Sequence, residues 1–230
     1  MNPGQRRRRR FVQLGRRYVR RTLARSLDGV YVAGLEAARR IARERPVILA
    51  ANHVAWWDSF LVVALDEALG TEGYALMDAA SVQQMPYFAW LGALPLNRAA
   101  PRPVLREAAA LLDRPLRAVW IFPSGEHRPA HLRPLSFQAG VRMLTRLAPQ
   151  AAVLPVAIQY AFAENSTPAA WVDIGVPVSG EDLEAAVETG LARIDSALIG
   201  NASAFALLVQ AKKRRPDQGL GARVLARLRG

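Results

Sequence analysis

A histidine and an aspartate stand five residues apart in the stretch NHVAWWD, residues 52–58. The chain has only three histidines, and this one lies between two apolar runs. An imidazole can act as a general base near neutral pH. A carboxylate that accepts a hydrogen bond from one ring nitrogen fixes the tautomer and leaves the other nitrogen free. His53 and Asp58 are therefore the candidate catalytic residues.

These two side chains can meet only outside a continuous helix, because five helical residues turn a side chain by about 140°. The run PVILAAN, residues 46–52, is typical of a buried strand, and residues 56–69 predict a helix. We predict His53 in the turn between them, a helix that begins near Ala55, and Asp58 in the first helical turn, where the helix dipole favours a carboxylate. Such a junction lies at the carboxyl edge of a sheet, where α/β proteins gather their sites.

No nucleophile of the chain clearly completes a triad with this pair. The chain has no cysteine, which excludes thiolate nucleophiles, disulfides and cysteine metal sites, and it has no G-x-S-x-G turn. We therefore expect the activated hydroxyl to belong to a substrate. Two alternatives stay open: Ser124 could be the nucleophile of a lipid or thioester hydrolase, and the pair could simply cap a helix.

Four blocks of sequence, in order, resemble those of the glycerolipid acyltransferases, the family that includes lysophosphatidate acyltransferase. NHVAWWD resembles the family's H-x-x-x-x-D block. GALPLNR (Gly92 to Arg98) resembles the second block, and FPSGE (Phe122 to Glu126) resembles the third, usually F-P-E-G-T-R. VLPV (Val153 to Val156) resembles the fourth, a V-P pair on a buried strand. The resemblance covers roughly residues 45 to 180.

This resemblance implies transfer of a fatty acyl group from acyl-CoA or acyl carrier protein to a lipid-linked hydroxyl. The expected acceptor is 1-acyl-glycerol-3-phosphate (lysophosphatidate), which gives phosphatidate without an acyl-enzyme. His53 would take the proton of the hydroxyl, and Asp58 would orient His53. Arg98 would bind the acceptor phosphate, and Gly125 would let the loop backbone approach the substrate. The other candidate substrate-binding residues are Asn52, Ser124, Glu126 and Arg128. No cofactor is expected beyond the acyl donor.

The third block departs from the family pattern. Ser124 stands where the family has glutamate, and an acid follows two places later as Glu126. His127 stands at the usual arginine position, and Arg128 follows it. If the loop shifts by a residue or two, Glu126 and Arg128 serve the same cleft. Otherwise acceptor recognition has changed, and a lipid without phosphate, for example a glycosylated one, becomes the alternative acceptor.

Helical and strand-like segments alternate from about residue 30 onward. We predict a single α/β domain over residues 30–211, with a mostly parallel central sheet flanked by helices on both faces. The expected strands are residues 46–52, 74–80, 93–98, 117–123, 152–162 and 171–178. The expected helices are residues 34–45, 56–69, 85–92, 104–113, 137–148 and 181–198. The aromatic residues of 56–69 and 85–90 could line an acyl channel, although core positions suit most of them better.

The net charge of +12 is carried by the two ends of the chain. Residues 1–25 contribute +10 and residues 212–230 contribute +6, so the intervening residues carry −4. Over residues 1–29 an apolar arc faces away from the arginines, which predicts a basic amphipathic helix in the interface of an anionic membrane. That arc consists of Val12, Val19, Leu23 and Leu27. No apolar run is long enough to span a bilayer. We therefore expect a peripheral protein on the cytoplasmic face of a membrane, although an arginine-rich leader could also be a transit peptide.

Two further classes are disfavoured. The basic ends could bind nucleic acid, but the chain has no helix-turn-helix, RNP or zinc-finger signature, and its middle is acidic, so we expect no nucleic-acid partner. His127 and His131 have the spacing of a metal site on a helix, but Pro129 separates them and no acidic cluster accompanies them. We expect no metal.

Overall fold

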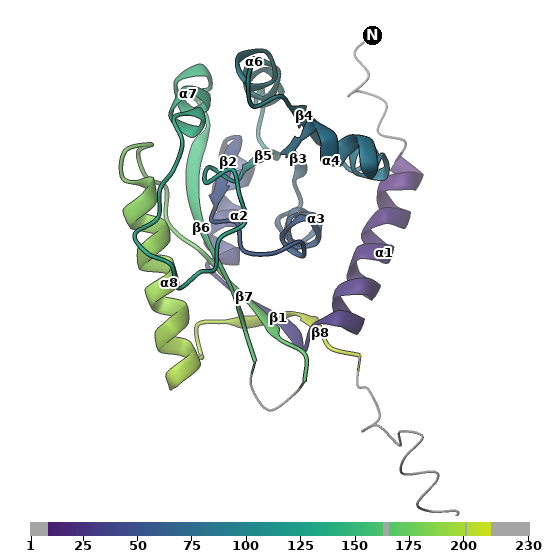
Figure 1. The fold of residues 1–230 in the computed structure, drawn as a ribbon, viewed down its shortest axis with the longest axis vertical. Coiled ribbons are helices and arrows are strands. Elements are labelled where there is room, and N and C mark those ends of the chain that lie inside the picture. Colours follow the sequence, from purple (N-terminus) through teal and green to yellow (C-terminus); the bar gives the residue numbers. More distant parts are fainter. Residues whose placement is uncertain (1–8, 163–165, 201, 213–230) are drawn as a thin grey trace, which may run out of the picture.

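The computed structural model describes residues 9–162, 166–200 and 202–212. Within these residues, eight strands form one sheet in the order β4-β3-β5-β2-β6-β7-β1-β8 (Figure 1). The strands are β1 (Gly29–Ala33), β2 (Val47–Ala51), β3 (Glu72–Asp78), β4 (Ala93–Leu96), β5 (Arg117–Ile121), β6 (Ala152–Ala161), β7 (Ala169–Ile174) and β8 (Ala206–Gln210). Only β6–β7 and β1–β8 pair antiparallel, so the prediction of a mostly parallel sheet is confirmed.

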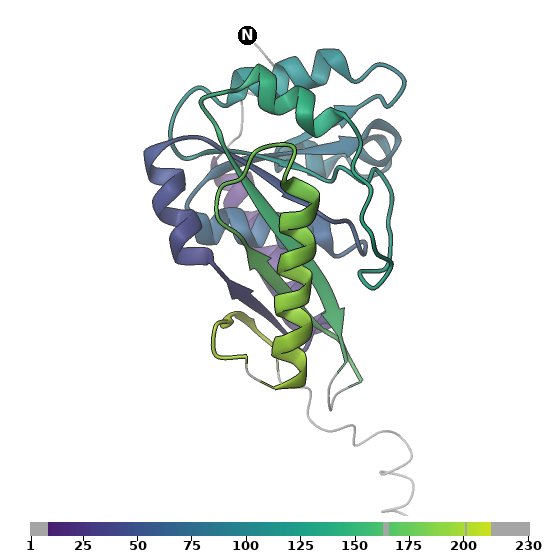
Figure 2. The same cartoon turned by 90° about the vertical axis from the view of Figure 1, so that its left-hand side faces the viewer.

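Helices cover both faces of the sheet, as predicted (Figure 2). One face carries α1 (Arg9–Ser26), α2 (Leu35–Glu44) and α3 (Asp58–Leu69). The other carries α6 (Arg102–Leu111), α7 (Gly140–Leu147) and α8 (Leu183–Ile199). Two short helices, α4 (Ala79–Gln84) and α5 (Tyr87–Trp90), connect β3 to β4 at one edge. Because each face has its own apolar cluster, the central strands are buried on both sides, which explains their unbroken apolar runs.

The N-terminal amphipathic helix is present, but its apolar arc does not face lipid. Val19, Leu23 and Leu27 are at most 2% exposed and pack in the core beneath the sheet. α1 lies against α3 and β8 (Figure 1), and its arginines at 17, 21 and 25 are exposed. The prediction that this arc enters a membrane is therefore wrong, because an apolar stripe fits a protein core as well as a bilayer.

The sequence also missed β1 and β8, which lie in or beside the segments treated as basic ends. Helix α1 and strand β1 belong to the same core as the rest of the domain, so the predicted boundary at residue 29 does not separate a distinct unit. The predicted C-terminal tail, residues 212–230, lies outside the described residues except for Lys212, and so do the first eight residues. None of the described helices is long and apolar enough to cross a bilayer.

Candidate active site

His53 and Asp58 meet at the junction between β2 and α3. Strand β2 ends at Ala51, the chain turns through residues 52–57, and α3 begins at Asp58. His53 Nδ1 lies 2.7 Å from Asp58 Oδ2. The predicted geometry, with the histidine in the turn and the aspartate in the first helical turn, is confirmed. The helix begins at Asp58 rather than near Ala55, because residues 56 and 57 form a turn.

The carboxylate of Asp58 is completely buried and accepts four hydrogen bonds. Besides the His53 ring, the backbone N–H groups of Val54 and Ala55 donate to Oδ2 at 2.7 and 3.1 Å. The Tyr160 hydroxyl donates to Oδ1 at 2.7 Å. Because every direction around the carboxylate has a donor, its orientation is fixed, and so is the ring nitrogen of His53 that it engages. Nε2 is the nitrogen left for a substrate.

Tyr160 was missed by the sequence analysis. It lies near the end of β6, in phase with Leu154, Val156 and Ile158, whose side chains pack on the α3 face of the sheet. Burial raises the pKa of its phenol well above the usual value, and the adjacent Asp58 carboxylate raises it further. The phenol therefore stays protonated and remains a donor to Asp58. The sequence did offer one signal for Tyr160: it lies two residues after Ile158 on the strand of the fourth block, so it shares the buried side of that strand.

Two rings pack against His53. Phe122 stacks on it with ring centroids 4.3 Å apart, and His127 lies at 4.0 Å with a tilt of 51°. Burial lowers the pKa of His127, the neighbouring His53 lowers it further, and Asp58 opposes the shift. His127 is thus a neutral imidazole at pH 7. It was missed as a site residue, although it occupies the position at which the third block usually ends in arginine.

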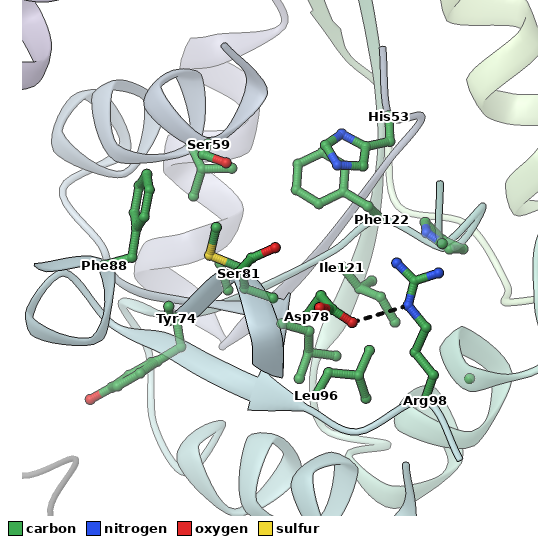
Figure 3. Close-up of a pocket in the computed structure, with 18 of the residues that line it drawn as sticks. His53, Ser59, Tyr74, Asp78, Ser81, Phe88, Leu96, Arg98, Ile121 and Phe122 are labelled. Atoms are coloured by element: carbon green, nitrogen blue, oxygen red, sulfur yellow. Dashed lines mark ion pairs between the residues drawn. The ribbon is translucent and has the colours of Figure 1, made fainter. Parts of the chain in front are cut away.

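A cavity of about 460 Å³ extends from His53 between α3 and the β3–β4 edge (Figure 3). Its deeper lining is mostly apolar and includes Val62, Val63, Leu76, Met85, Phe88 and Leu91. Trp56 also lines it, yet 46% of this side chain is exposed. Thus part of the aromatic set in residues 56–69 and 85–90 lines the cavity, whereas Phe60 lies in the core at 1% exposed. A cavity of this size and lining suits a hydrocarbon chain.

Polar side chains gather at the His53 end of the cavity. Arg98 follows β4 and extends toward the side that carries His53 and Phe122 (Figure 3). Its Nε lies 3.4 Å from Oδ1 of Asp78, the last residue of β3. The Arg98 side chain is 57% exposed and that of Asp78 is 37% exposed, so this ion pair is well solvated. A carboxylate beside the guanidinium weakens its attraction for a second anion.

Comparisons with known proteins add to this geometry of a histidine beside an apolar cavity. A model of the family described as acyltransferase matches residues 29–159, more than half of the chain. The chain belongs to the acyltransferase family. Its fold is similar to the crystal structure of the 1-acyl-sn-glycerophosphate (LPA) acyltransferase PlsC from Thermotoga maritima, with a TM-score of 0.57. The two share 22% sequence identity over 82% of this chain and 79% of the other. The comparison with curated proteins returned no match.

In this acyltransferase the third block forms a loop bonded to the first. The backbone N–H of Arg128 donates to the carbonyl oxygen of His53 at 2.7 Å. Gly125 lines the cavity with φ of +72°, and a Cβ at this position would lie 2.6 Å from Gln138 Nε2. Both constraints explain a glycine here, because other residues rarely adopt this conformation. Glu126 also lines the cavity.

Three predicted substrate-binding residues, Asn52, Ser124 and Arg128, are not among the cavity-lining residues. Asn52 is 3% exposed, and its side-chain amide exchanges two hydrogen bonds with the backbone of Ile158, at 2.9 and 2.8 Å. This position serves to hold the turn against β6 rather than to contact substrate. The hydroxyl of Ser124 donates to the carbonyl of Glu126 at 3.1 Å. That placement does not support Ser124 as a hydrolase nucleophile paired with His53.

Metal ligands do not cluster in the part of the chain that the structure describes, where no three histidine or acidic side chains come together in a metal-binding group. His127 instead packs on His53.

Proposed function

We propose that this acyltransferase transfers a fatty acyl group from a thioester donor, acyl-CoA or acyl carrier protein, to a lipid-linked hydroxyl, with His53 as general base. Nε2 of His53 takes the proton as the hydroxyl oxygen attacks the thioester carbonyl carbon. The C–O bond forms, the C–S bond of the tetrahedral intermediate breaks, and the sulfur takes the proton back from His53 and leaves as a thiol. Asp58 holds the ring and stabilises its protonated form during the step. No group of the protein becomes acylated.

The observation that carries this proposal is the position of the His53–Asp58 pair at the polar end of an apolar cavity. The acyl chain would occupy the deep part, which puts the thioester carbonyl near Nε2. In the part of the chain that is described, no serine hydroxyl bonds to His53, which is consistent with a base that activates a substrate hydroxyl.

The acceptor that we propose first is lysophosphatidate, with Arg98 binding its phosphate. A guanidinium at the cavity entrance is chemically suited to that role. Two observations favour a second candidate, a glycosylated lipid without phosphate. Arg98 is already paired with Asp78, and His127 supplies a neutral ring where the family block usually supplies an arginine. Both reduce the positive charge available to a phosphate monoester.

An acceptor panel assayed with a labelled acyl thioester tests the proposal. It compares lysophosphatidate, glycerol 3-phosphate, lysophospholipids and a glycosylated lipid lacking phosphate. Product from lysophosphatidate that is lost in a folded His53→Ala protein supports the first candidate. Product only from the glycosylated lipid supports the second and removes the phosphate role of Arg98. Full activity in the His53→Ala protein, or thioester hydrolysis that depends on Ser124, overturns the mechanism.

We also propose that the protein binds the cytoplasmic face of an anionic membrane peripherally, through a surface other than the buried arc of α1. We call this surface the aromatic face: Leu14, Tyr18, Trp56, Tyr87 and Trp90 are each at least 37% exposed. The rings of Trp56 and Tyr18 both lie near Phe60, at 4.6 and 6.4 Å, so α1 and the turn before α3 contribute jointly. Exposed aromatic residues beside arginines suit the interface of an anionic bilayer.

Vesicle sedimentation tests this membrane proposal. The full chain should sediment with phosphatidylcholine vesicles only when phosphatidylglycerol is added, and Tyr18→Ser/Trp90→Ser should reduce binding. Ile199→Ser is the matched control, because Ile199 is 89% exposed at the end of α8 on the other side of the sheet. An equal loss in the control, or no dependence on anionic lipid, contradicts the assignment of the aromatic face.

A further inference from the structure

Four exposed arginines stand on two neighbouring helices beside the reaction cavity. Arg102 and Arg106 are four residues apart on α6, and Arg142 and Arg146 are four residues apart on α7. Residues at this spacing share one side of a helix. The two helices lie next to each other on the same face of the sheet (Figure 1). Together the four arginines make a basic surface, which we call the α6–α7 arginine face.

The side chains of these four arginines are exposed and unpaired within the described residues, as are those of Arg40 and Arg43 on α2. Within the described residues, none of the four guanidinium groups has a hydrogen bond or an ion pair. By contrast, Arg39 and Arg193 each donate to a named acceptor on another element, Ala68 and Asp173. Helix α7 has no acidic residue at all. Helix α6 carries one acid, Glu107, directly after Arg106. Like charges four residues apart disfavour a helix, so an anionic partner would relieve a repulsion that α7 leaves uncompensated.

A groove lies between this face and the cavity that contains His53. It lies between the starts of α6 and α7 and has a volume of about 470 Å³. Pro101, Leu105, Ala139 and Gly140 line both the groove and the cavity that contains His53, so the two spaces adjoin. Arg102 is the only residue with a polar side chain that lines the groove. The groove therefore marks the shortest route for a thin arm from the arginine face toward His53.

We propose that the α6–α7 arginine face docks a small acidic carrier protein, and that the groove admits its phosphopantetheine arm with the acyl thioester at the end. This inference rests on the proposed function, which requires a thioester donor. A nucleotide donor would need a concave site with several polar groups for its base and ribose, and the groove lining offers only Arg102. The arginines stand instead on the outer sides of two helices, where they match carboxylates spread along an acidic helix.

The experiment compares two donors that carry the same acyl group, an acyl carrier protein and acyl-CoA, with one acceptor and the full chain. The test variant is Arg106→Glu/Arg146→Glu, which reverses two charges outside the groove. The matched control is Arg40→Glu/Arg43→Glu, because these arginines are also exposed and without ion pairs, but belong to α2 on the opposite face of the sheet.

The test variant should raise the KM for the acyl carrier protein by about tenfold or more and flatten its salt dependence, with kcat nearly unchanged. Its kinetics with acyl-CoA should change by less than about threefold, and the control should match the wild type with both donors. An equal rise in KM for both donors would show that the arginines hold a phosphate common to both and would overturn the protein-docking proposal. The proposal would also be overturned if the test variant changed the kinetics with neither donor, or if the wild type used acyl-CoA alone.

Binding measured without turnover separates this inference from the proposed function. The affinity of the acyl carrier protein for the His53→Ala chain, followed by fluorescence anisotropy, does not depend on transfer. Binding that the Arg106→Glu/Arg146→Glu change weakens supports docking even if no acceptor of the panel is acylated. Transfer from acyl carrier protein without arginine-dependent binding overturns docking and leaves the proposed function standing.

Discussion

Two carboxylates beside the same cavity are held in opposite ways. Asp58 is completely buried and accepts four hydrogen bonds, one of them from the His53 ring. Asp78 is partly exposed, and its Oδ1 forms a solvated ion pair with Arg98 Nε at 3.4 Å. The first arrangement fixes the orientation of the His53 ring, because the Asp58 carboxylate that bonds to it is itself held at both oxygens. The second can open at little cost, since exposed ion pairs contribute about 0–1 kcal/mol.

This contrast separates two tasks of the site. The Asp58 region would serve a step that is the same for every acceptor, the removal of a proton from a hydroxyl. The Asp78 region would meet the part of the acceptor that differs between lipids. We therefore expect changes at the first to abolish activity with all acceptors, and changes at the second to redistribute activity among them.

The largest effect is expected for His53→Ala. Removing a general base costs about 10²- to 10⁴-fold in rate, so kcat should fall by that factor with every acceptor. The far-ultraviolet circular dichroism should stay close to the wild type, whereas the midpoint of urea unfolding should fall, because the buried Asp58 carboxylate loses one of its four hydrogen bonds. If His53→Ala loses activity with one acceptor and keeps it with another, the contrast between the two regions fails, because His53 would then not act on every acceptor.

Asp58→Asn is expected to come next. The neutral amide keeps one oxygen for the donors at Oδ2, but it cannot accept the Tyr160 hydroxyl proton at the other position, and it no longer stabilises a protonated His53 ring. We expect kcat to fall about 10²-fold or more, and the free energy of unfolding to fall by about 1–3 kcal/mol. Steady-state kinetics and urea unfolding measure the two effects. A normal kcat would mean that Asp58 only supports the fold.

Tyr160→Phe should act mainly on stability. The phenol donates to a buried carboxylate, so its loss should cost about 1.5–3 kcal/mol in the free energy of unfolding, with a smaller effect on kcat. Because the pKa of Tyr160 is raised in the folded protein, above about pH 10 the unfolded chain loses a proton that the folded chain keeps. Its contribution to stability is therefore present below pH 10 and falls as the pH rises further. Urea titrations from pH 8 to 11 should show this alkaline loss in the wild type and less of it in the variant.

The smallest effect is expected for Asp78→Asn. Asparagine can still accept the hydrogen bond from Ala80 N–H that caps α4, so the fold should be preserved. Removing the negative charge beside Arg98 should raise kcat/KM for a phosphate-bearing acceptor about 3- to 10-fold relative to a neutral glycosylated one. Asp113→Asn, an exposed carboxylate at the end of α6, is the matched control. A uniform change with all acceptors would show that this carboxylate does not discriminate between them.

The central pair was predictable because its geometry is local. A buried strand, a turn and a helix within residues 46–69 fix how His53 and Asp58 face each other, and the sequence shows all three. Tyr160 was not predictable in this way, because it lies 102 residues from Asp58. Its position depends on how β6 pairs with β2, where Ala51 stands opposite Val156. No local pattern determines that register.

The errors at the two ends of the chain have a different cause. The apolar arc of α1 was assigned to a membrane because periodicity shows that a helix has an apolar side but not what covers it. Strands β1 and β8 are short and adjoin basic segments, and they pair with each other across most of the chain length. Likewise, the sequence places Asn52 beside His53 but does not reveal that its amide is used entirely by Ile158.

The hydrogen bond from Arg128 to the carbonyl of His53 limits how this site can diversify. It constrains the length of the loop from the end of β5 to Arg128. An inserted or deleted residue near Gly125 would displace Arg128 and, through this hydrogen bond, the turn that contains His53. New acceptor preferences must then arise by exchanging side chains within a loop of constant length. The substitution of His127 for an arginine, with no change in the spacing from Phe122 to Gly125, is a change of that kind. Among related chains, therefore, the residues of this loop should vary while its length does not.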